Sequence, residues 1–257
     1  VTRMKSADVK ASYDFLKAKG VNLLSEVLTS PDGKPHFFLK DPYGNIFQVV
    51  PGTDWFGNGK QLTGGPAGAM LGVSNMEKSM AFYGNVLGYD QVVYDKVSVA
   101  GDLQCLPGGG AHVRRVLLNH SKPRSGSFSK LLGSSSIELI QVMDRVPRKI
   151  FENRFWGDLG FIHLCYDISG MKELQAICEK NNAPFTVDSG GNFDMGEAAG
   201  HFTYVEDPDC TLIEFVETFK IPILKKLGWY LDLRKRAAGK ALPDWMLKSM
   251  AMNRVKD

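Results

Sequence analysis

The chain has 257 residues, of which 44% are hydrophobic and 11% aromatic, so it can form a packed interior and is not intrinsically disordered. No apolar run approaches the roughly 20 residues that a membrane-spanning helix needs, and the first residues lack the pattern of a secretory signal. The formal net charge is +3, and residues 219–257 carry a basic excess that indicates a solvated helical face rather than a nucleic-acid site. Four cysteines without a Cys-x-x-Cys pair indicate reduced thiols. We therefore expect a cytoplasmic protein that binds neither nucleic acid nor membrane.

The first stretch predicts one helix followed by three strands. Asp8 is a favourable N-cap for a helix over residues 9–19, and Gly20 ends that helix. Strands are expected over residues 23–29, 36–40 and 45–50. The glycine-rich residues 51–66 show no apolar periodicity and predict a linker.

The same plan occurs twice more along the chain. In the second stretch, the spacing of apolar residues predicts a helix over residues 76–87. Its strands are expected over residues 91–99, 112–119 and 136–142. In the third stretch, a strand over residues 161–168 precedes a helix over residues 171–181. Further strands are expected over residues 184–187, 201–205 and 211–217. The tail over residues 218–257 predicts two short helices.

The last strands of these stretches show the repeat in the sequence itself. DPYGNIFQVV (residues 41–50) and DPDCTLIEFV (residues 207–216) share an Asp-Pro turn followed by an apolar strand. When the two are superimposed without gaps, Gln48 falls on Glu214. The strand SSSIELIQVM places Glu138 at the same position.

The first strands repeat as well. GAMLGVSNMEKSMAFYGNVLG and HLCYDISGMKELQAICEKNNA each run from a strand into an amphipathic helix, and Gly68 then corresponds to His163. In the first stretch, Val1 takes that position. The chain therefore reads as one small module used three times.

This repeat, the phrase VSNMEKSMAFYGNVLG and the two Asp-Pro endings resemble the vicinal oxygen chelate superfamily. That superfamily includes glyoxalase I, extradiol dioxygenases, methylmalonyl-CoA epimerase and bleomycin-resistance proteins. The resemblance covers residues 1–217. It implies an α+β fold of βαβββ modules, in which paired modules form an open, barrel-like mixed sheet around a divalent metal.

The resemblance also implies a division into domains. We expect half of an N-terminal domain over residues 1–50, a linker over 51–66, one domain of two paired modules over 67–217 (67–144 and 160–217), and a basic helical tail over 218–257. The first module has Val1 and Gln48 at its ligand positions, which predicts no complete metal site there. Its pairing partner is expected either in a module before Val1 or across a homodimer.

Carried over by position, the second and third modules offer Gly68, Glu138, His163 and Glu214 as the metal ligands, and three of these four residues can bind a metal. One imidazole and two carboxylates suit Zn²⁺, Ni²⁺, Mn²⁺ or Fe²⁺. Both glutamates are flanked by apolar residues, where a charge needs a partner or a metal. A histidine in an apolar strand is, on the other hand, more often a hydrogen-bonded core residue than a ligand.

The resemblance implies a metal-dependent lyase or isomerase of the glyoxalase type, which acts on a small oxygenated substrate through an enediolate-like intermediate. Glu138 or Glu214 is the candidate base. Arg114 and Arg115 lie on opposite faces of one strand, so one of them is expected to face the cavity and to hold an anionic group of the substrate. Gly68 argues against a dioxygenase, which needs a second histidine at that position. The alternatives are a metal-free, bleomycin-resistance-like binding protein and a scaffold or regulatory subunit.

Overall fold

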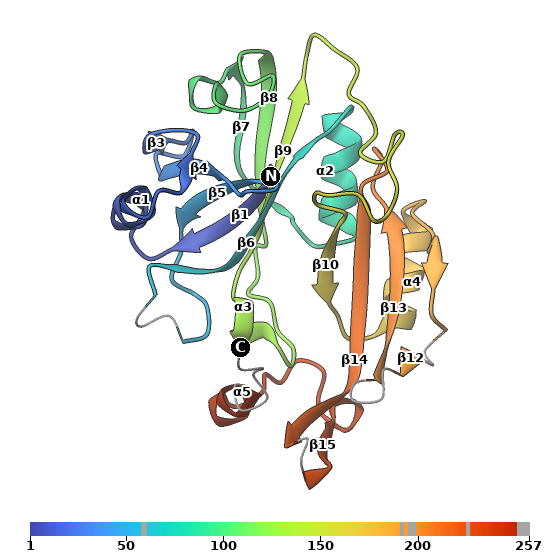
Figure 1. Ribbon diagram of the computed structural model, residues 1–257. Helices are drawn as coiled ribbons and strands as arrows, with labels where there is room; N and C mark the ends of the chain where they lie inside the picture. The colour runs from blue at the N-terminus through green and yellow to red at the C-terminus, as the bar shows by residue number, and fades with distance from the viewer. Residues whose placement is uncertain (58–60, 191–192, 195–198, 225–226, 251–257) are drawn as a thin grey trace. The chain divides into compact units, whose positions relative to one another are not determined.

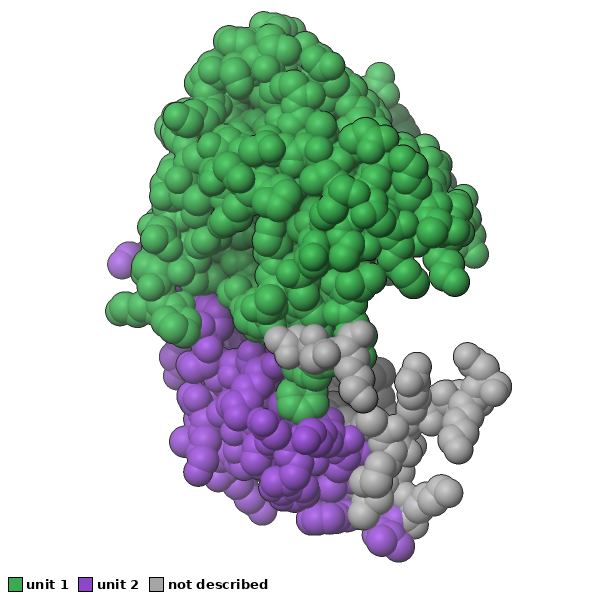
Figure 2. Space-filling model, turned by 90° about the vertical axis from the view of Figure 1, so that its left-hand side faces the viewer, with its two compact units in different colours: residues 1–123, 132–162, 208–210 green, residues 124–131, 163–207, 211–257 purple. Residues whose placement is uncertain are grey.

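A computed structural model describes residues 1–57, 61–190, 193–194, 199–224 and 227–250. The chain divides into two compact units, which Figure 2 colours separately. Unit 1 comprises residues 1–123, 132–162 and 208–210, and unit 2 comprises residues 124–131, 163–207 and 211–257. Each unit has its own sheet. Within the described part of the chain, the helices are too short or too polar to cross a membrane.

Unit 1 contains the first two modules (Figure 1). Its strands are β1 (Thr2–Ser6), β2 (Asn22–Leu23), β3 (Leu28–Thr29), β4 (Pro35–Lys40), β5 (Ile46–Pro51), β6 (Thr63–Gly72), β7 (Gln91–Val99), β8 (His112–Asn119) and β9 (Ser136–Val142). Its helices are α1 (Val9–Ala18), α2 (Met76–Asn85) and the short 3₁₀ helix η1 (Gly101–Leu103). Helix α3 (Ser129–Leu132) lies where the chain passes between the two units.

The two modules of unit 1 share one sheet with the strand order β2-β4-β5-β1-β6-β9-β8-β7, and β3 pairs with β4. In each module the first strand runs parallel to the last, as β1 does to β5 and β6 does to β9. The two first strands, β1 and β6, pair antiparallel with each other. This pairing joins the two modules into a single sheet.

Local sequence explains why these elements form. The Asp8 side chain caps α1 by accepting a hydrogen bond from the backbone N–H of Ala11 at 2.9 Å. In β4, alternation directs Phe37 and Leu39 into a core cluster with residues of α1. It directs Phe38 into a second cluster with residues of β6, η1 and β8. Both faces of β4 are therefore buried.

Unit 2 repeats the plan of one module. Its elements are β10 (His163–Asp167), α4 (Met171–Lys180), β11 (Val187–Asp188), β12 (Phe193–Asp194), β13 (Ala199–Glu206), β14 (Leu212–Leu224), β15 (Trp229–Asp232), η3 (Leu233–Lys235) and α5 (Asp244–Met250). The strand order is β10-β14-β13-β11, with the first strand again beside the last. The predicted α+β fold of repeated βαβββ modules with open sheets is confirmed.

The turns before the last strands are equivalent in the first and third modules. The Asp41 carboxylate accepts a hydrogen bond from the backbone N–H of Asn45, and Asp207 accepts one from Thr211, both at 2.8 Å. Gly44 and Cys210 occupy the same place in the two turns and both have a positive φ. The Asp-Pro repeat in the sequence thus corresponds to a repeated turn in the structure.

The structure departs from the expected domain division in three respects. The second module pairs with the first rather than the third, because one edge of β6 is taken by β1 and the other by β9. The expected linker also ends early, because β6 begins at Thr63. The tail is not wholly helical, since the apolar residues after Glu217 continue β14 to Leu224 and β15 pairs with them. Residues 225–226 and 251–257 lie outside the described part of the chain.

The position of Gly68 gives a prediction about stability. Gly68 has φ +120°, and a Cβ there would lie 1.8 Å from the backbone oxygen of Ser136. Gly68→Ala is expected to lower the free energy of unfolding by at least about 1–3 kcal/mol, measured by urea denaturation. Gly72 lies in the same strand with open space around its Cβ position. Gly72→Ala is the matched control, and an equal loss in both variants would contradict this account.

Candidate functional site

The third module brings together two of the predicted site residues. In the parallel pair of β10 and β14, Cys165 lies opposite Glu214, and His163 precedes Cys165 by two residues. His163 and Glu214 therefore project from the same face of the sheet. The Nε2 atom of His163 lies 2.9 Å from Oε2 of Glu214, and both side chains are partly exposed, at 26% and 17%. An imidazole and a carboxylate thus meet at a position that solvent can reach.

Tyr204 forms a hydrogen bond with the other carboxylate oxygen of Glu214. It lies opposite Glu214 in the antiparallel pair of β13 and β14, and its hydroxyl donates a hydrogen bond of 2.9 Å to Oε1 of Glu214. Its ring packs edge-on against His163, with ring centroids 5.5 Å apart. Burial and the Glu214 carboxylate raise the pKa of Tyr204. The tyrosine therefore remains a hydrogen-bond donor at neutral pH and fixes the orientation of Glu214.

Cys165 and Asp167 continue this face along β10. Although Cys165 as a residue is exposed, desolvation of its thiol and then the hydrogen bond and charge of the Glu214 carboxylate raise its pKa to about 12. The thiol is thus protonated at neutral pH, whereas a nucleophilic cysteine must be a thiolate. Burial also raises the pKa of Asp167.

Glu138, the third predicted ligand, is held within unit 1 by an arginine and a tyrosine. Its Oε1 atom accepts hydrogen bonds from the Tyr94 hydroxyl at 2.6 Å and from the Nε and Nη2 atoms of Arg115 at 2.9 and 2.6 Å. Glu138 and Arg115 are each 1% exposed. The buried carboxylate is therefore neutralised by a guanidinium in direct contact with it.

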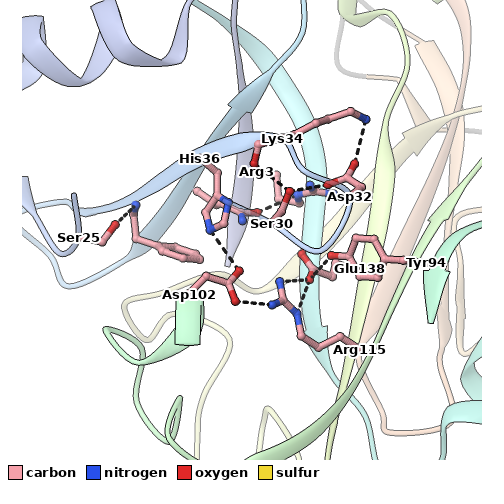
Figure 3. A network of polar contacts seen from close by, with 12 residues as sticks. Arg3, Ser25, Ser30, Asp32, Lys34, His36, Tyr94, Asp102, Arg115 and Glu138 are labelled. Carbon is pink, nitrogen blue, oxygen red and sulfur yellow. Dashed lines mark hydrogen bonds and ion pairs between the residues drawn. The ribbon is translucent and has the colours of Figure 1, made fainter. Parts of the chain in front are cut away.

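The network continues from Arg115 into the first module (Figure 3). Nη1 of Arg115 donates a hydrogen bond of 2.7 Å to Oδ1 of Asp102, which stands on η1. The other carboxylate oxygen of Asp102 lies 3.4 Å from Nε2 of His36 on β4. Burial lowers the pKa of His36, although the charges of Asp102 and Glu138 oppose this shift. Side chains from both modules thus form one buried polar cluster.

A second arginine, Arg3, contacts Gln48, which stands at the ligand position of the first module. Arg3 on β1 is 7% exposed, and its Nε atom donates a hydrogen bond of 2.9 Å to Oε1 of Gln48. Its Nη1 atom donates to the Ser136 hydroxyl on β9 at 2.5 Å. Gln48 is therefore engaged with an arginine, as Glu138 is.

Arg114 and Arg115, of which one was expected to face a substrate, point in opposite directions. Arg115 lies in the buried cluster, whereas Arg114 forms ion pairs with Glu77 and Asp95 on the other face of the sheet. Gly68 contributes only backbone, since the backbone of Ser136 occupies the space of a side chain. A substrate contact for either arginine remains a prediction.

The predicted trio is divided between the two units. His163 and Glu214 meet in unit 2, while Glu138 is engaged in unit 1. Among the described residues, no group of three His, Cys, Asp or Glu side chains is arranged to hold a metal ion. Sequence analysis missed Tyr204 and the part that His36 and Asp102 play in the cluster. The phenylalanines beside His36 were a signal, because they place a polar side chain in a strand with two apolar faces.

Comparison with solved structures identifies the fold. A crystal structure of glyoxalase I from Zea mays superposes with a TM-score of 0.54 and 15% sequence identity, covering 84% of this chain and 66% of the maize chain. A Bacillus subtilis protein provisionally named a dioxygenase superposes with a TM-score of 0.53 and 13% identity, covering 84% of this chain and 60% of its own. The chain has the vicinal oxygen chelate fold.

The superposition leaves the activity open. No protein-family model and no curated protein sequence matches this chain. The chain spans less than two thirds of the length of the maize protein, and identities of 13–15% establish a shared fold rather than a shared reaction. The function has to be argued from the residues at the ligand positions of the vicinal oxygen chelate fold.

The cluster of unit 1 predicts a strong contrast between the two neighbouring arginines. Arg115→Met leaves the Glu138 charge buried and unpaired, and is expected to lower the free energy of unfolding by about 3–5 kcal/mol. Arg114→Met removes ion pairs at the surface and is expected to cost no more than about 1 kcal/mol. Urea denaturation measures both values. Adding Glu138→Leu to Arg115→Met should restore most of the loss, and a double variant as unstable as the single one would refute the pairing.

His36 predicts a pH dependence of stability. Because burial lowers its pKa below the ordinary value of 6.5, the unfolded chain binds a proton in a pH range where the folded chain does not. The free energy of unfolding is therefore expected to fall as the pH is lowered through and below 6.5, by at most about 1.4 kcal/mol per pH unit for this one proton.

The measurement compares urea denaturation at pH 7.5 and 5.5 in three proteins. His36→Phe should flatten the dependence, while His112→Gln, which changes an exposed histidine of the same unit, should leave it unchanged. Identical slopes in the wild type and in His36→Phe would show that His36 does not titrate in this way.

Proposed function

We propose that the third module carries half of the metal centre of a glyoxalase-type lyase or isomerase that acts on a small oxygenated substrate. The observation that supports this proposal is the contact of 2.9 Å between His163 and Glu214 on one face of adjacent strands. These residues stand on the first and last strands of the module, where the resemblance places metal ligands. Both side chains are partly exposed, so a metal and a substrate can reach them.

The chemistry of this donor pair fits a divalent metal. A neutral imidazole nitrogen and a carboxylate oxygen are ligands of Zn²⁺, Ni²⁺, Mn²⁺ and Fe²⁺. Tyr204 holds Oε1 of Glu214 and leaves Oε2 directed toward His163. Such a hydrogen bond to a ligating carboxylate is the kind of outer contact that orients metal ligands. Two protein ligands are fewer than catalytic zinc sites have, so the other half of the site must come from another module.

Glu138 does not fit a metal ligand. Three donors already converge on its Oε1 atom, and two of them belong to the guanidinium of Arg115. A divalent cation beside this guanidinium would meet a fixed positive charge at low dielectric. We therefore assign the predicted metal site to His163 and Glu214 without Glu138.

The open edge of β10 supports a role for a further module. In the described part of unit 2, β10 is the terminal strand of the sheet order. In unit 1 the two first strands, β1 and β6, pair antiparallel with each other. A further module that paired with β10 in the same way would bring its own ligand positions next to His163. That module would belong to a second copy of this chain or to a further segment.

In the proposed reaction, the residues of this chain bind, orient and move a proton. A bound metal would supply Lewis-acid polarisation of the substrate carbonyl. Oε2 of Glu214 would give up its position as a ligand to accept the proton from the carbon next to that carbonyl, while the Tyr204 hydroxyl keeps the carboxylate in place. Cys165 would remain a protonated thiol and take no part as a nucleophile.

Metal binding is the direct test of this assignment. Protein freed of metal is titrated with Zn²⁺, Ni²⁺ or Mn²⁺ by calorimetry, and its metal content is counted by plasma mass spectrometry. His163→Ala and Glu214→Gln each remove a ligand and are expected to weaken binding by more than about 100-fold, since even outer contacts contribute 10–100-fold. Sedimentation of the same samples shows whether a second copy completes the site.

Two control variants make the result specific. His201→Ala changes another histidine of the same sheet, which pairs with Asp188 instead of Glu214, and it should bind metal like the wild type. Glu138→Gln should do the same. If Glu138→Gln weakened binding as strongly as His163→Ala, Glu138 would be a ligand after all. If the wild type bound none of the three metals, the metal-free binding protein would be the better account.

A further inference from the structure

The sheet of unit 1 ends in a long strand whose outer edge has no partner strand among the described residues. β7 covers nine residues and pairs with β8 alone (Figure 1). The other end of the sheet, β2, is only two residues long. Natural proteins usually shorten, bend or cover the outer strands of their sheets, because unpaired N–H and C=O groups can pair with another chain. β7 is therefore the end of this sheet at which another strand could add.

A β-bulge divides β7 into two parts. The register against β8 shifts between Val92 and Tyr94, which bends the strand there and disturbs its edge. From Tyr94 to Val99 the pairing with β8 is regular. This second part contains no proline, and residues 95–99 are all exposed. The part of the edge that is both regular and exposed thus spans residues 95–99.

Exposed apolar side chains accompany this part of the edge. Val97 and Val99 are each 55% exposed, and they project from the same face of the sheet because they are two residues apart. Val99 lies opposite His112 of β8, and the carbonyl oxygen of His112 accepts a hydrogen bond from the backbone N–H of the exposed Met143. Apolar side chains grouped beside an unpaired edge, unlike single ones scattered over a surface, indicate a contact with another protein.

The charges of β7 limit how a second strand can lie against it. A lysine on an edge hinders unspecific pairing, and like charges directly opposite each other in a sheet are destabilising. Two copies of β7 paired parallel and in register would bring Asp95 beside Asp95 and Lys96 beside Lys96. An antiparallel pair with its twofold axis at either residue would do so for that residue. An axis at Val97 would place Val99 opposite Asp95, so these arrangements are all unfavourable.

A twofold axis at Ser98 avoids these conflicts. It places Val97 of each copy opposite Val99 of the other, so that the valines of both copies adjoin on one face. It places Lys96 opposite Ala100, where the long lysine side chain can still reach water. We propose that β7 is a homodimer interface, in which two copies of this chain pair their β7 strands antiparallel about an axis at Ser98. Such a contact uses the same surface in both copies and closes on itself.

This interface lies within unit 1 and does not rest on the proposed metal centre of the third module. Sedimentation velocity over a wide range of protein concentration should show a monomer that converts into a dimer. Hydrogen exchange, measured at low and high concentration, should slow in the peptide that covers residues 95–100, because N–H groups of the edge become hydrogen-bonded in the dimer.

Paired substitutions test which residues lie opposite each other. Val97→Lys combined with Val99→Lys places lysine opposite lysine, and is expected to raise the dissociation constant of the dimer by at least about tenfold. Val97→Glu combined with Val99→Lys places opposite charges together and should restore the dimer. Val92→Lys changes an exposed valine before the bulge, outside the proposed pairing, and should leave the dimer unchanged. Circular dichroism confirms that each variant is folded.

A disulfide tests the position of the axis. Directly opposite residues of an antiparallel pair have Cα atoms about 4.5–5.5 Å apart, within the range of about 4.4–6.8 Å that a disulfide spans. Ser98→Cys should therefore give a disulfide-linked dimer under mild oxidation. In Lys96→Cys the two new thiols would lie about 13 Å apart along the strands and should not react. The wild type, with its own cysteines, gives the background.

Three results would overturn the proposal. The first is a wild type that stays monomeric at every concentration. The second is a dimer that persists undiminished when Val97 and Val99 are both replaced by lysine, which would place the contact elsewhere, for example at β10. The third is a covalent dimer that is as abundant in Lys96→Cys as in Ser98→Cys, since the axis would then not lie at Ser98.

Discussion

The structure depends on a simple constraint, namely that a β-strand has two edges and can pair with two neighbours. In unit 1, β6 uses one edge for β9 of its own module and the other for β1 of the first module. No edge of β6 remains through which the first strand of the second module could pair with the third module. Because first strands carry the ligand positions, the choice of partner strand decides which side chains can meet. Glu138 consequently belongs to a cluster that reaches His36 of the first module through Arg115 and Asp102, whereas His163 contacts Glu214 of its own module.

The sequence predicted the modules well and their pairing poorly, and both results have physical causes. Alternation, capping residues and the Asp-Pro turns act over a few residues, so the helices and most strands lie close to their predicted places. The register that aligned Gln48, Glu138 and Glu214 is also correct, because each lies on the strand parallel to the first strand of its module. Pairing between modules has no such local signal, because the first strands of the three modules have similar backbone edges and any two of them could pair. The predicted trio of Glu138, His163 and Glu214 was wrong at that step, because it required the second module to pair with the third.

The same reasoning explains why only part of the candidate site could be foreseen. The contact between His163 and Glu214 lies within one module and follows from the register of β10 and β14. The surroundings of Glu138 depend on how two modules fold over one another, which brings Asp102 of η1 close to His36 of β4. A sequence read strand by strand places an arginine and a glutamate in largely apolar strands, but it does not show that they are buried together and neutralise each other. Pairing of this kind stabilises a buried charge without any metal.

The corresponding positions of the three modules hold Gln48, Glu138 and Glu214, of which the first two contact an arginine and the third contacts a histidine. Gln48 faces Arg3 and Glu138 faces Arg115, and a guanidinium stays protonated and cannot act as a metal ligand. Glu214 faces His163, and an imidazole nitrogen can serve as a metal ligand. A metal can take the place of a proton between an imidazole and a carboxylate. A metal bound to a carboxylate that is already paired with a guanidinium would instead place a second positive charge beside the guanidinium. The identity of the basic partner therefore separates the third module from the other two.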